Sequence, residues 1–350
     1  MESGNFHASH NPYKRLKLMA YTGMALSVVA LVLVAALSLE LTHGLIGRSS
    51  SSTVLEPIFV TGPLITPPLS LSDAPPILTQ EPFGQRLTDI NVPLNSTQLA
   101  VINGGPDSYF DTAARMYLNG SLTSLVGAQV ASVPLMTVNG KPAVVYLGAI
   151  SCIYCGENRW AMALALSRFG VFQDLFFGYS SWGDQDVPTL YWAPAPYNAT
   201  SAADFGNFYD GNYVTFLSID YASPITAGFQ MQTLPFFQQQ ATAINNTVYE
   251  KATSLLISLN NFAGTPYTIW GRYSVPGADA KDFGDVTSTS ISSSSSTSST
   301  SSAAVLLPLA TMTHDQVLAS LARPTTPFAW TEYAAADYYV ALICSSLGVA

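Results

Sequence analysis

Two cysteines separated by two residues, Cys152 and Cys155, are the side chains of this 350-residue sequence best suited to chemistry. The spacing alone leaves three interpretations open: a redox-active pair, a structural disulfide, or half of a metal site. A closed zinc site needs four Cys or His ligands. Beyond residue 40 the chain offers only three cysteines together with His43 and His314. The supply of ligands therefore makes the metal interpretation the weakest, and no cofactor is expected.

The elements on either side of the pair favour the redox interpretation. Residues 142–149 are almost wholly apolar and follow an Asn-Gly turn signal, which predicts a buried central strand. Residues 157–169 have the apolar spacing of a helix. At a helix N-terminus, unpaired N–H groups and the helix dipole stabilise a thiolate. We therefore expect Cys152 to be the nucleophile and Cys155, one turn further on, to be the resolving thiol.

Two residues that follow the dithiol, Arg159 and Trp160, and the third cysteine, Cys344, are interpreted as structural. Trp160 fits the apolar face of the expected helix and is predicted to be core. Arg159 is interpreted as a solvated surface charge, with support of the thiolate as the alternative. Cys344 lies in an apolar helical stretch and is predicted to be a buried unpaired thiol, although pairing with a second chain stays open.

The sequence around the dithiol resembles a known family. Val144 to Cys155, continued by Arg-Trp-Ala at 159–161 and Ala-Leu-Ser-Arg-Phe-Gly at 165–170, is similar to the domain of unknown function 929 family. That family consists of archaeal membrane-anchored proteins of the thioredoxin-like superfamily. It commonly has proline where this chain has Ile153, which bears on the redox potential but not on the dithiol itself.

The resemblance extends over roughly residues 95–350 and implies a thioredoxin-like α/β fold related to DsbA. Such folds place a cis-proline loop beside the dithiol, and Thr265-Pro266 before the apolar residues 267–270 resembles it. The Thr265 backbone would then pair with an extended substrate. A trans bond before an edge strand is the alternative, and Leu234-Pro235 is a less suitable candidate. The long separation from Cys152 implies a helical, aromatic-rich insertion over residues 172–260.

The N-terminal region predicts a membrane anchor. Residues 18–39 are uncharged and apolar, and a helix of that length spans about 33 Å, enough to cross a bilayer. Basic residues end the 1–17 leader before it, so the positive-inside rule places the leader in the cytoplasm and the rest of the chain outside. The expectation is a single-pass signal-anchor in the cell membrane, and a cleaved signal peptide is the alternative.

Composition divides the remainder of the chain. Residues 40–87 are rich in Pro and Ser and predict an extracytoplasmic stalk. Residues 88–350 form the expected thioredoxin-like domain, interrupted by a disordered Ser/Thr tract at 287–302. Further predicted elements are helices at 97–102, 108–118, 246–260, 313–321 and 330–347, and a strand at 214–219. Sequons that offer candidate glycosylation sites begin at Asn95, Asn119, Asn198 and Asn245.

Charge and context narrow the function. The chain has 13 Lys and Arg against 22 Asp and Glu, a net charge of −9, which disfavours nucleic acid as a partner. We expect an extracytoplasmic thiol–disulfide oxidoreductase that acts on exported protein thiols and is recycled by a membrane quinone-linked thiol oxidase. The alternative is a non-enzymatic surface or binding module in which Cys152–Cys155 is structural. A copper(I) metallochaperone is the third possibility.

Overall fold

The apolar run at residues 142–149 forms the central strand of a mixed α/β structure, as predicted. This strand, β4 (Lys141–Ala149), is buried at every residue after Lys141. It pairs in parallel with β10 (Thr215–Ala222) and antiparallel with β11 (Tyr267–Trp270). Strands on both sides and helices on both faces leave it no solvent-facing side, which is why its sequence shows no polar alternation.

The computed structural model describes residues 55–67, 89–119, 121–122, 131–150, 152–180, 187–195, 202–222, 234–259, 266–275 and 308–348. These residues all belong to one unit, Leu55–Ala350. The predicted leader, the anchor at 18–39, much of the stalk and the 287–302 tract lie outside the described residues. Among the described residues, no helix is long and apolar enough to cross a membrane.

The remaining strands extend the sheet on both sides of β4 or form small satellites. Beyond β10 lies β8, beyond β11 lie β12 and β2, and β3 joins the start of β4 to the edge strand β1. Two satellite sheets pair β5 with β9 and β6 with β7. The bounds are β1 (Ile58–Val60), β2 (Ala131–Ser132), β3 (Met136–Val138), β5 (Gly170–Phe172), β6 (Phe176–Tyr179), β7 (Pro188–Tyr191), β8 (Ala202–Phe205), β9 (Tyr209–Gly211) and β12 (Tyr273–Val275).

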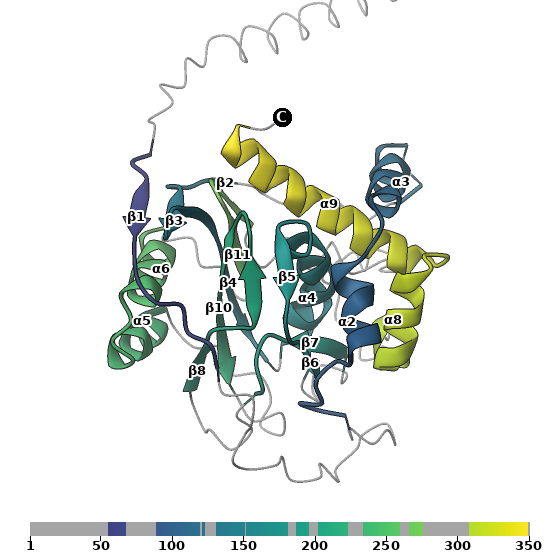
Figure 1. The fold of residues 1–350 in the computed structure, drawn as a ribbon, viewed down its shortest axis with the longest axis horizontal. Coiled ribbons are helices and arrows are strands. Elements are labelled where there is room, and N and C mark those ends of the chain that lie inside the picture. The colour runs from purple at the N-terminus through teal and green to yellow at the C-terminus, as the bar shows by residue number, and fades with distance from the viewer. Residues whose placement is uncertain are drawn as a thin grey trace, which may run out of the picture. The chain divides into compact units, whose positions relative to one another are not determined.

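Helices cover both faces of the sheet (Figure 1). One face carries α5 and α6, and the other carries α4 and α9 together with α2, α3 and α8. Alternate residues of β4 serve the two cores: Val144 and Tyr146 pack in the α4–α9 cluster, whereas Val145 and Leu147 pack in the α6 cluster. The bounds are α2 (Ser96–Asn103), α3 (Asp107–Leu118), α4 (Ile153–Leu166), α5 (Leu234–Ala243), α6 (Thr247–Ser258), a 3₁₀ turn (Pro308–Thr311), α8 (His314–Ala322) and α9 (Pro327–Leu347).

Capping residues set most of the helix starts. The predicted capping box of Thr313 with Gln316 at the start of α8 is confirmed. Asn95 caps α2 through a second capping box, and Asn246 caps α6. Helix α9 begins three residues before the predicted start at 330, because Thr326 caps it and proline at its first position has a φ suited to a helix.

The segment at 172–260 is more strand-rich than expected. It holds β6 to β9 before its helices α5 and α6. The predicted strand at 214–219 is β10, which pairs along most of β4. Part of this segment therefore belongs to the central sheet, where its apolar residues are buried against β4.

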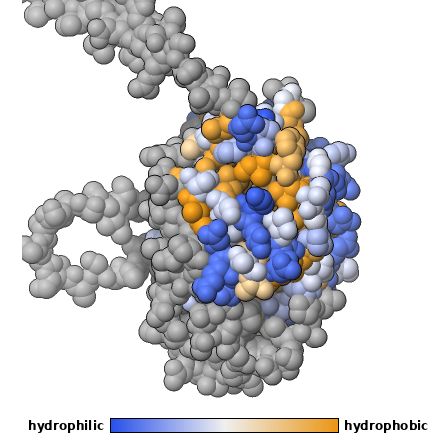
Figure 2. Space-filling model, turned by 90° about the vertical axis from the view of Figure 1, so that its left-hand side faces the viewer, coloured by the Kyte–Doolittle hydropathy of each residue, from blue (hydrophilic) through white to orange (hydrophobic). Residues whose placement is uncertain are grey.

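The edge strand β1 exposes one large aromatic side chain. Phe59 is 76% exposed, while Val60 points the other way into the core. Figure 2 shows this face of the molecule, on which apolar side chains gather among polar ones. Asn139 hydrogen-bonds both the amide and the carbonyl of Gly62, which ties the segment after β1 to the β3–β4 turn.

A buried histidine, His314, links the segment just before α2 to α8. His314 Nδ1 lies 2.7 Å from Asp89 Oδ2, and Nε2 lies 2.8 Å from the Gly178 carbonyl oxygen. The ring stacks on Phe177 with centroids 4.3 Å apart. Burial raises the pKa of Asp89, but the hydrogen bond and charge of His314, together with hydrogen bonds from Tyr179 and the backbone, outweigh burial and hold that pKa below its ordinary 3.8.

Asp89→Asn is expected to lower the free energy of unfolding by about 1.5 kcal/mol, since an amide oxygen accepts weaker hydrogen bonds from His314 and Tyr179 than a carboxylate does. A carboxyl with a lowered pKa stabilises the folded state above its unfolded pKa, so the difference should be full above about pH 4 and shrink as the pH falls. Urea denaturation across pH measures it, with the exposed Asp210→Asn as control. A difference undiminished at about pH 2 would contradict the assignment.

Candidate functional site

The dithiol lies at the junction of β4 and α4. Helix α4 begins at Ile153, earlier than the predicted 157, so that Cys152 is its N-cap residue, with φ −80° and ψ 127°. Cys155 follows in the first turn. The exposed fraction is 4% for Cys152 and 0% for Cys155, and both are thiols in this structure. A sheet-to-helix turn thus presents the first sulfur at the helix N-terminus and buries the second.

Ala149, the last residue of β4, holds both cysteines. Its amide N–H donates to Cys155 Sγ at 3.4 Å. Its carbonyl oxygen accepts from the Cys152 amide at 3.2 Å and from Arg159 Nη2 at 3.0 Å. The end of the central strand therefore fixes the position of the dithiol relative to a charged side chain.

The surroundings of Cys155 favour its protonated form. Burial raises the pKa of the Cys155 thiol well above its ordinary range, and a hydrogen bond and charge from Cys152 raise it further. The charge of Arg159 and the amide of Ala149 act in the opposite direction but are smaller. Cys155 is thus protonated beside Cys152, as expected of a resolving thiol before it attacks a mixed disulfide.

Arg159 is a buried charge, which corrects its interpretation as a solvated surface residue. Its exposed fraction is 0%, and Nη2 lies 2.6 Å from Asp220 Oδ1 on β10. Its guanidinium carbon lies 5.5 Å from the Tyr146 ring centroid and 5.7 Å from that of Tyr191. Among the described residues, no hydrogen-bond partner reaches its Nε or Nη1. The side chain turns inward because a carboxylate and two aromatic rings there replace its hydration.

Asp220 and Gly148 are the residues that sequence reasoning missed. They are neighbours in the parallel β4–β10 register. A Cβ on Gly148 would lie 2.0 Å from the Tyr146 hydroxyl oxygen, so only glycine leaves room for that hydroxyl. Burial raises the pKa of Asp220 even though Arg159 lowers it. The available signal was an acidic residue inside an otherwise uncharged strand.

Pro266 lies at the same end of the sheet as the dithiol. It is buried and directly precedes β11, whose first residue, Tyr267, pairs with Leu147. Extending this register by one residue places Pro266 beside Gly148, four residues before Cys152. Thr265 lies outside the described residues, so the cis-proline loop stays a prediction.

One family matches a stretch that contains all of these residues. The family described as a domain of unknown function (DUF929) matches residues 128–344, more than half of the chain. The chain belongs to this family. No curated protein and no solved structure matches it. The matched DUF929 region runs from just before β2 into α9 and includes the dithiol, Arg159, Asp220 and Pro266.

Other residues of the DUF929 region flank the site or lie away from it. Tyr154, between the cysteines, is 43% exposed and offers an aromatic surface beside Cys152. Trp160 is core, as predicted, and donates from Nε1 to the Pro188 carbonyl at 3.1 Å. Cys344 is half-buried on α9 and packs against the α4–α9 cluster, whereas Cys152 and Cys155 belong to the α6 cluster.

The structure bears on metal binding and on the exposure of the candidate glycosylation sites. Within the described ranges, no cluster of three or more His, Cys, Asp or Glu side chains could hold a metal ion. Asn95, Asn119 and Asn245 are exposed, and Asn198 lies outside these ranges. Their glycosylation stays a prediction.

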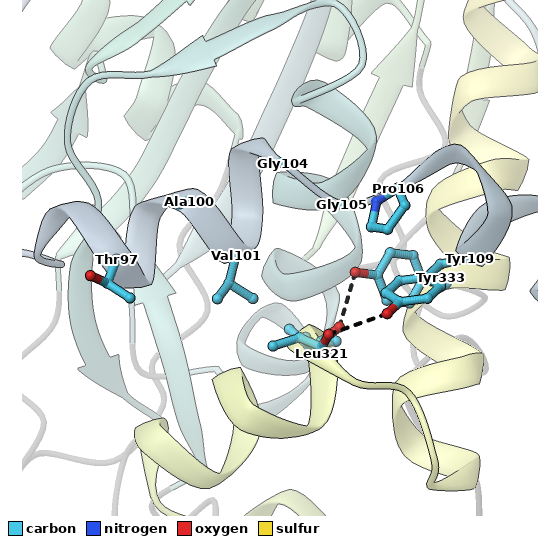
Figure 3. Close-up of a pocket in the computed structure, with 10 residues that line it drawn as sticks. Thr97, Ala100, Val101, Gly104, Gly105, Pro106, Tyr109, Leu321 and Tyr333 are labelled. Carbon is cyan, nitrogen blue, oxygen red and sulfur yellow. Dashed lines mark hydrogen bonds between the residues drawn. The ribbon is translucent and has the colours of Figure 1, made fainter.

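A separate cavity of about 250 Å³ opens between α2, α3, α8 and α9 (Figure 3). The Tyr333 hydroxyl donates to the Leu321 carbonyl at 3.1 Å, and that of Tyr109 donates to the Ala322 carbonyl at 3.4 Å. Its lining has neither a thiol nor a carboxylate, and its polar side-chain groups are the hydroxyls of Thr97, Tyr109 and Tyr333. The lining residues are Thr97, Ala100, Val101, Gly104, Gly105, Pro106, Tyr109, Leu321, Ala322 and Tyr333.

Proposed function

We propose that this protein is a thiol–disulfide oxidoreductase with a thioredoxin-like fold, related to DsbA. It would be anchored by residues 18–39 and act outside the cytoplasm on the thiols of exported proteins. The observation that carries the proposal is the placement of Cys152 at the N-cap of α4, with Cys155 buried one turn further on. A dithiol next to a β-α-β unit, here β4–α4–β10, is typical of thioredoxin-like redox sites. The β11–β12 hairpin, which pairs with β4, and α9, which packs on α4, are compatible with such a fold.

The different surroundings of Cys152 and Cys155 account for the steps of the oxidising reaction. A substrate thiolate attacks Cys152 Sγ of the Cys152–Cys155 disulfide, and Cys155 leaves and takes up a proton, because burial raises its pKa. A second substrate thiolate attacks the substrate sulfur of the mixed disulfide. Cys152 then leaves as a thiolate that the N-terminus of α4 stabilises. Two electrons pass to the protein, and a quinone-linked thiol oxidase is the class of partner that removes them.

Substrate trapping tests these roles. In a Cys344→Ser background, Cys155→Ser should accumulate mixed disulfides with exported proteins, because Cys152 can still attack a substrate disulfide, whereas the Cys155 thiol that would release the substrate by the reverse of the first step is gone. Cys152→Ser should accumulate few or none, since Cys155 is fully buried. Non-reducing electrophoresis followed by mass spectrometry measures both. Equal trapping by the two variants, or by neither, would count against the assignment.

The burial of both sulfurs favours a second candidate, a binding module in which Cys152 and Cys155 form a structural disulfide. Cys152 is only 4% exposed. A redox titration of the chain separates the two functions: an exchange site should have a potential within the range of biological dithiols, roughly −120 to −270 mV, whereas a structural disulfide should lie below about −300 mV.

A further inference from the structure

The interface between α4 and α9 buries two carboxyl groups that the proposed thiol chemistry does not use. Glu157 on α4 and Glu332 on α9 are each 1% exposed. Next to Glu157, Asn158 Oδ1 accepts a hydrogen bond of 2.6 Å from the hydroxyl of Tyr339 on α9. The two carboxyls therefore lie where α9 docks on α4, the helix that carries the dithiol. Glu157 lies two residues beyond Cys155 in the sequence.

No described cation compensates Glu332. Among the described residues, no side chain hydrogen-bonds its carboxylate oxygens. The backbone N–H of Ala161 on α4 approaches them without completing a hydrogen bond of normal geometry, so that it lowers the pKa of Glu332 by less than burial and Glu157 raise it. Burial raises the pKa of Glu332 well above its ordinary value, and the charge of Glu157 on the facing helix raises it further. Tyr339, on the same helix, also has a raised pKa, from burial and then from the charge of Glu332.

The charged groups on the neighbouring elements are engaged elsewhere. Burial raises the pKa of Asp337, further along α9, and the charge of Asp111 on α3 raises it further, while Arg168 lowers it. Arg159 pairs with Asp220, Arg168 with Asp107 and His314 with Asp89, and Arg115 on α3 is exposed. Two like charges in a buried interface repel, and a buried carboxylate without a hydrogen-bond donor is costly, so the docked interface favours the protonated form of Glu332.

We propose that Glu157 and Glu332 form a proton-binding site whose occupancy controls the docking of α9 on the dithiol-bearing helix. The ligand is the proton itself. The folded chain keeps this proton at a pH at which the unfolded chain has lost it. The stabilisation is therefore complete below the unfolded value of about 4.5 and is lost as the pH rises through the folded value. Raising the pH should thus weaken the docking of α9 on α4 before it affects the rest of the fold.

Hydrogen exchange on the full chain, followed by mass spectrometry of peptides covering 327–347, tests the proposal. Corrected for the intrinsic exchange rate, the protection of α9 should fall by up to about tenfold for each pH unit between about 4.5 and the folded pKa of Glu332, and should level off above that pKa. In Glu332→Gln the protection should change less than about twofold over the same range, because the amide carries no charge. Below about pH 4.5, variant and wild type should be equally protected.

Two further arms make the outcome decisive. Glu56→Gln removes an exposed carboxyl and should leave the pH dependence unchanged. If Glu332→Gln does not fold, Glu157→Gln removes the facing charge and should make the protection of α9 level off at a lower pH, because Glu332 stays buried but loses the second cause of its raised pKa. A wild-type profile without pH dependence, or the same dependence in a folded Gln variant, would overturn the proposal. Since the readout uses no thiol, its failure is distinguishable from a failure of the proposed function.

Discussion

Arg159→Met is expected to lower the free energy of unfolding by about 3–5 kcal/mol, because it leaves one member of a buried ion pair without its partner. The guanidinium is fully buried and lies 2.6 Å from Asp220 Oδ1. Methionine fills much of the same space but leaves the Asp220 carboxylate without its counter-charge in the interior. The Ala149 carbonyl also loses a donor at the base of the dithiol.

Two comparisons isolate the buried charge as the cause. Arg159→Met combined with Asp220→Asn should recover at least half of the lost stability, because the uncompensated charge is gone. Arg168→Met removes an arginine that pairs with Asp107 at the surface and should cost no more than about 1 kcal/mol. Urea denaturation of the full chain measures all three variants. If the double variant were as unstable as the single one, packing and not charge would be the reason.

Cys155 is expected to react with iodoacetamide at neutral pH about 100-fold or more slowly in the folded chain than in urea. Its sulfur is inaccessible, and its pKa lies well above the ordinary 9.0, chiefly through burial. Because only the thiolate reacts, each unit of pKa above the ambient pH reduces the reactive fraction about tenfold. The rate in the folded state should therefore keep rising with pH beyond the point at which the urea-unfolded thiol levels off.

Peptide mapping of alkylated wild-type chain measures each cysteine separately. Cys344, which is half-buried and outside the site, serves as the internal comparison. In Arg159→Met the labelling of Cys155 should shift to still higher pH, because the charge of Arg159 lowers the pKa of this thiol. Equal labelling of Cys155 in the folded and unfolded chain would contradict both the burial and the role as a resolving thiol.

The sequence by itself determined the parts of the site that depend on neighbours along the chain. An apolar run long enough for a fully buried strand predicted β4, and helical spacing after the dithiol predicted α4. Thr313 with Gln316 determined the start of α8, since a capping box is a contact between residues three apart. Local propensity and periodicity were sufficient for these elements because their defining interactions lie within a few residues.

Only the tertiary structure decided which side chains share the interior. Arg159 follows the dithiol and looked solvent-facing, yet Asp220, 61 residues away, draws it inside. Glu157 and Glu332 come together because α9 docks on α4, and His314 meets Asp89 across 225 residues. No local pattern encodes such pairs. Whether a charge is buried depends on the strand register and helix docking that bring its partner, and these are set by the packing of the whole core.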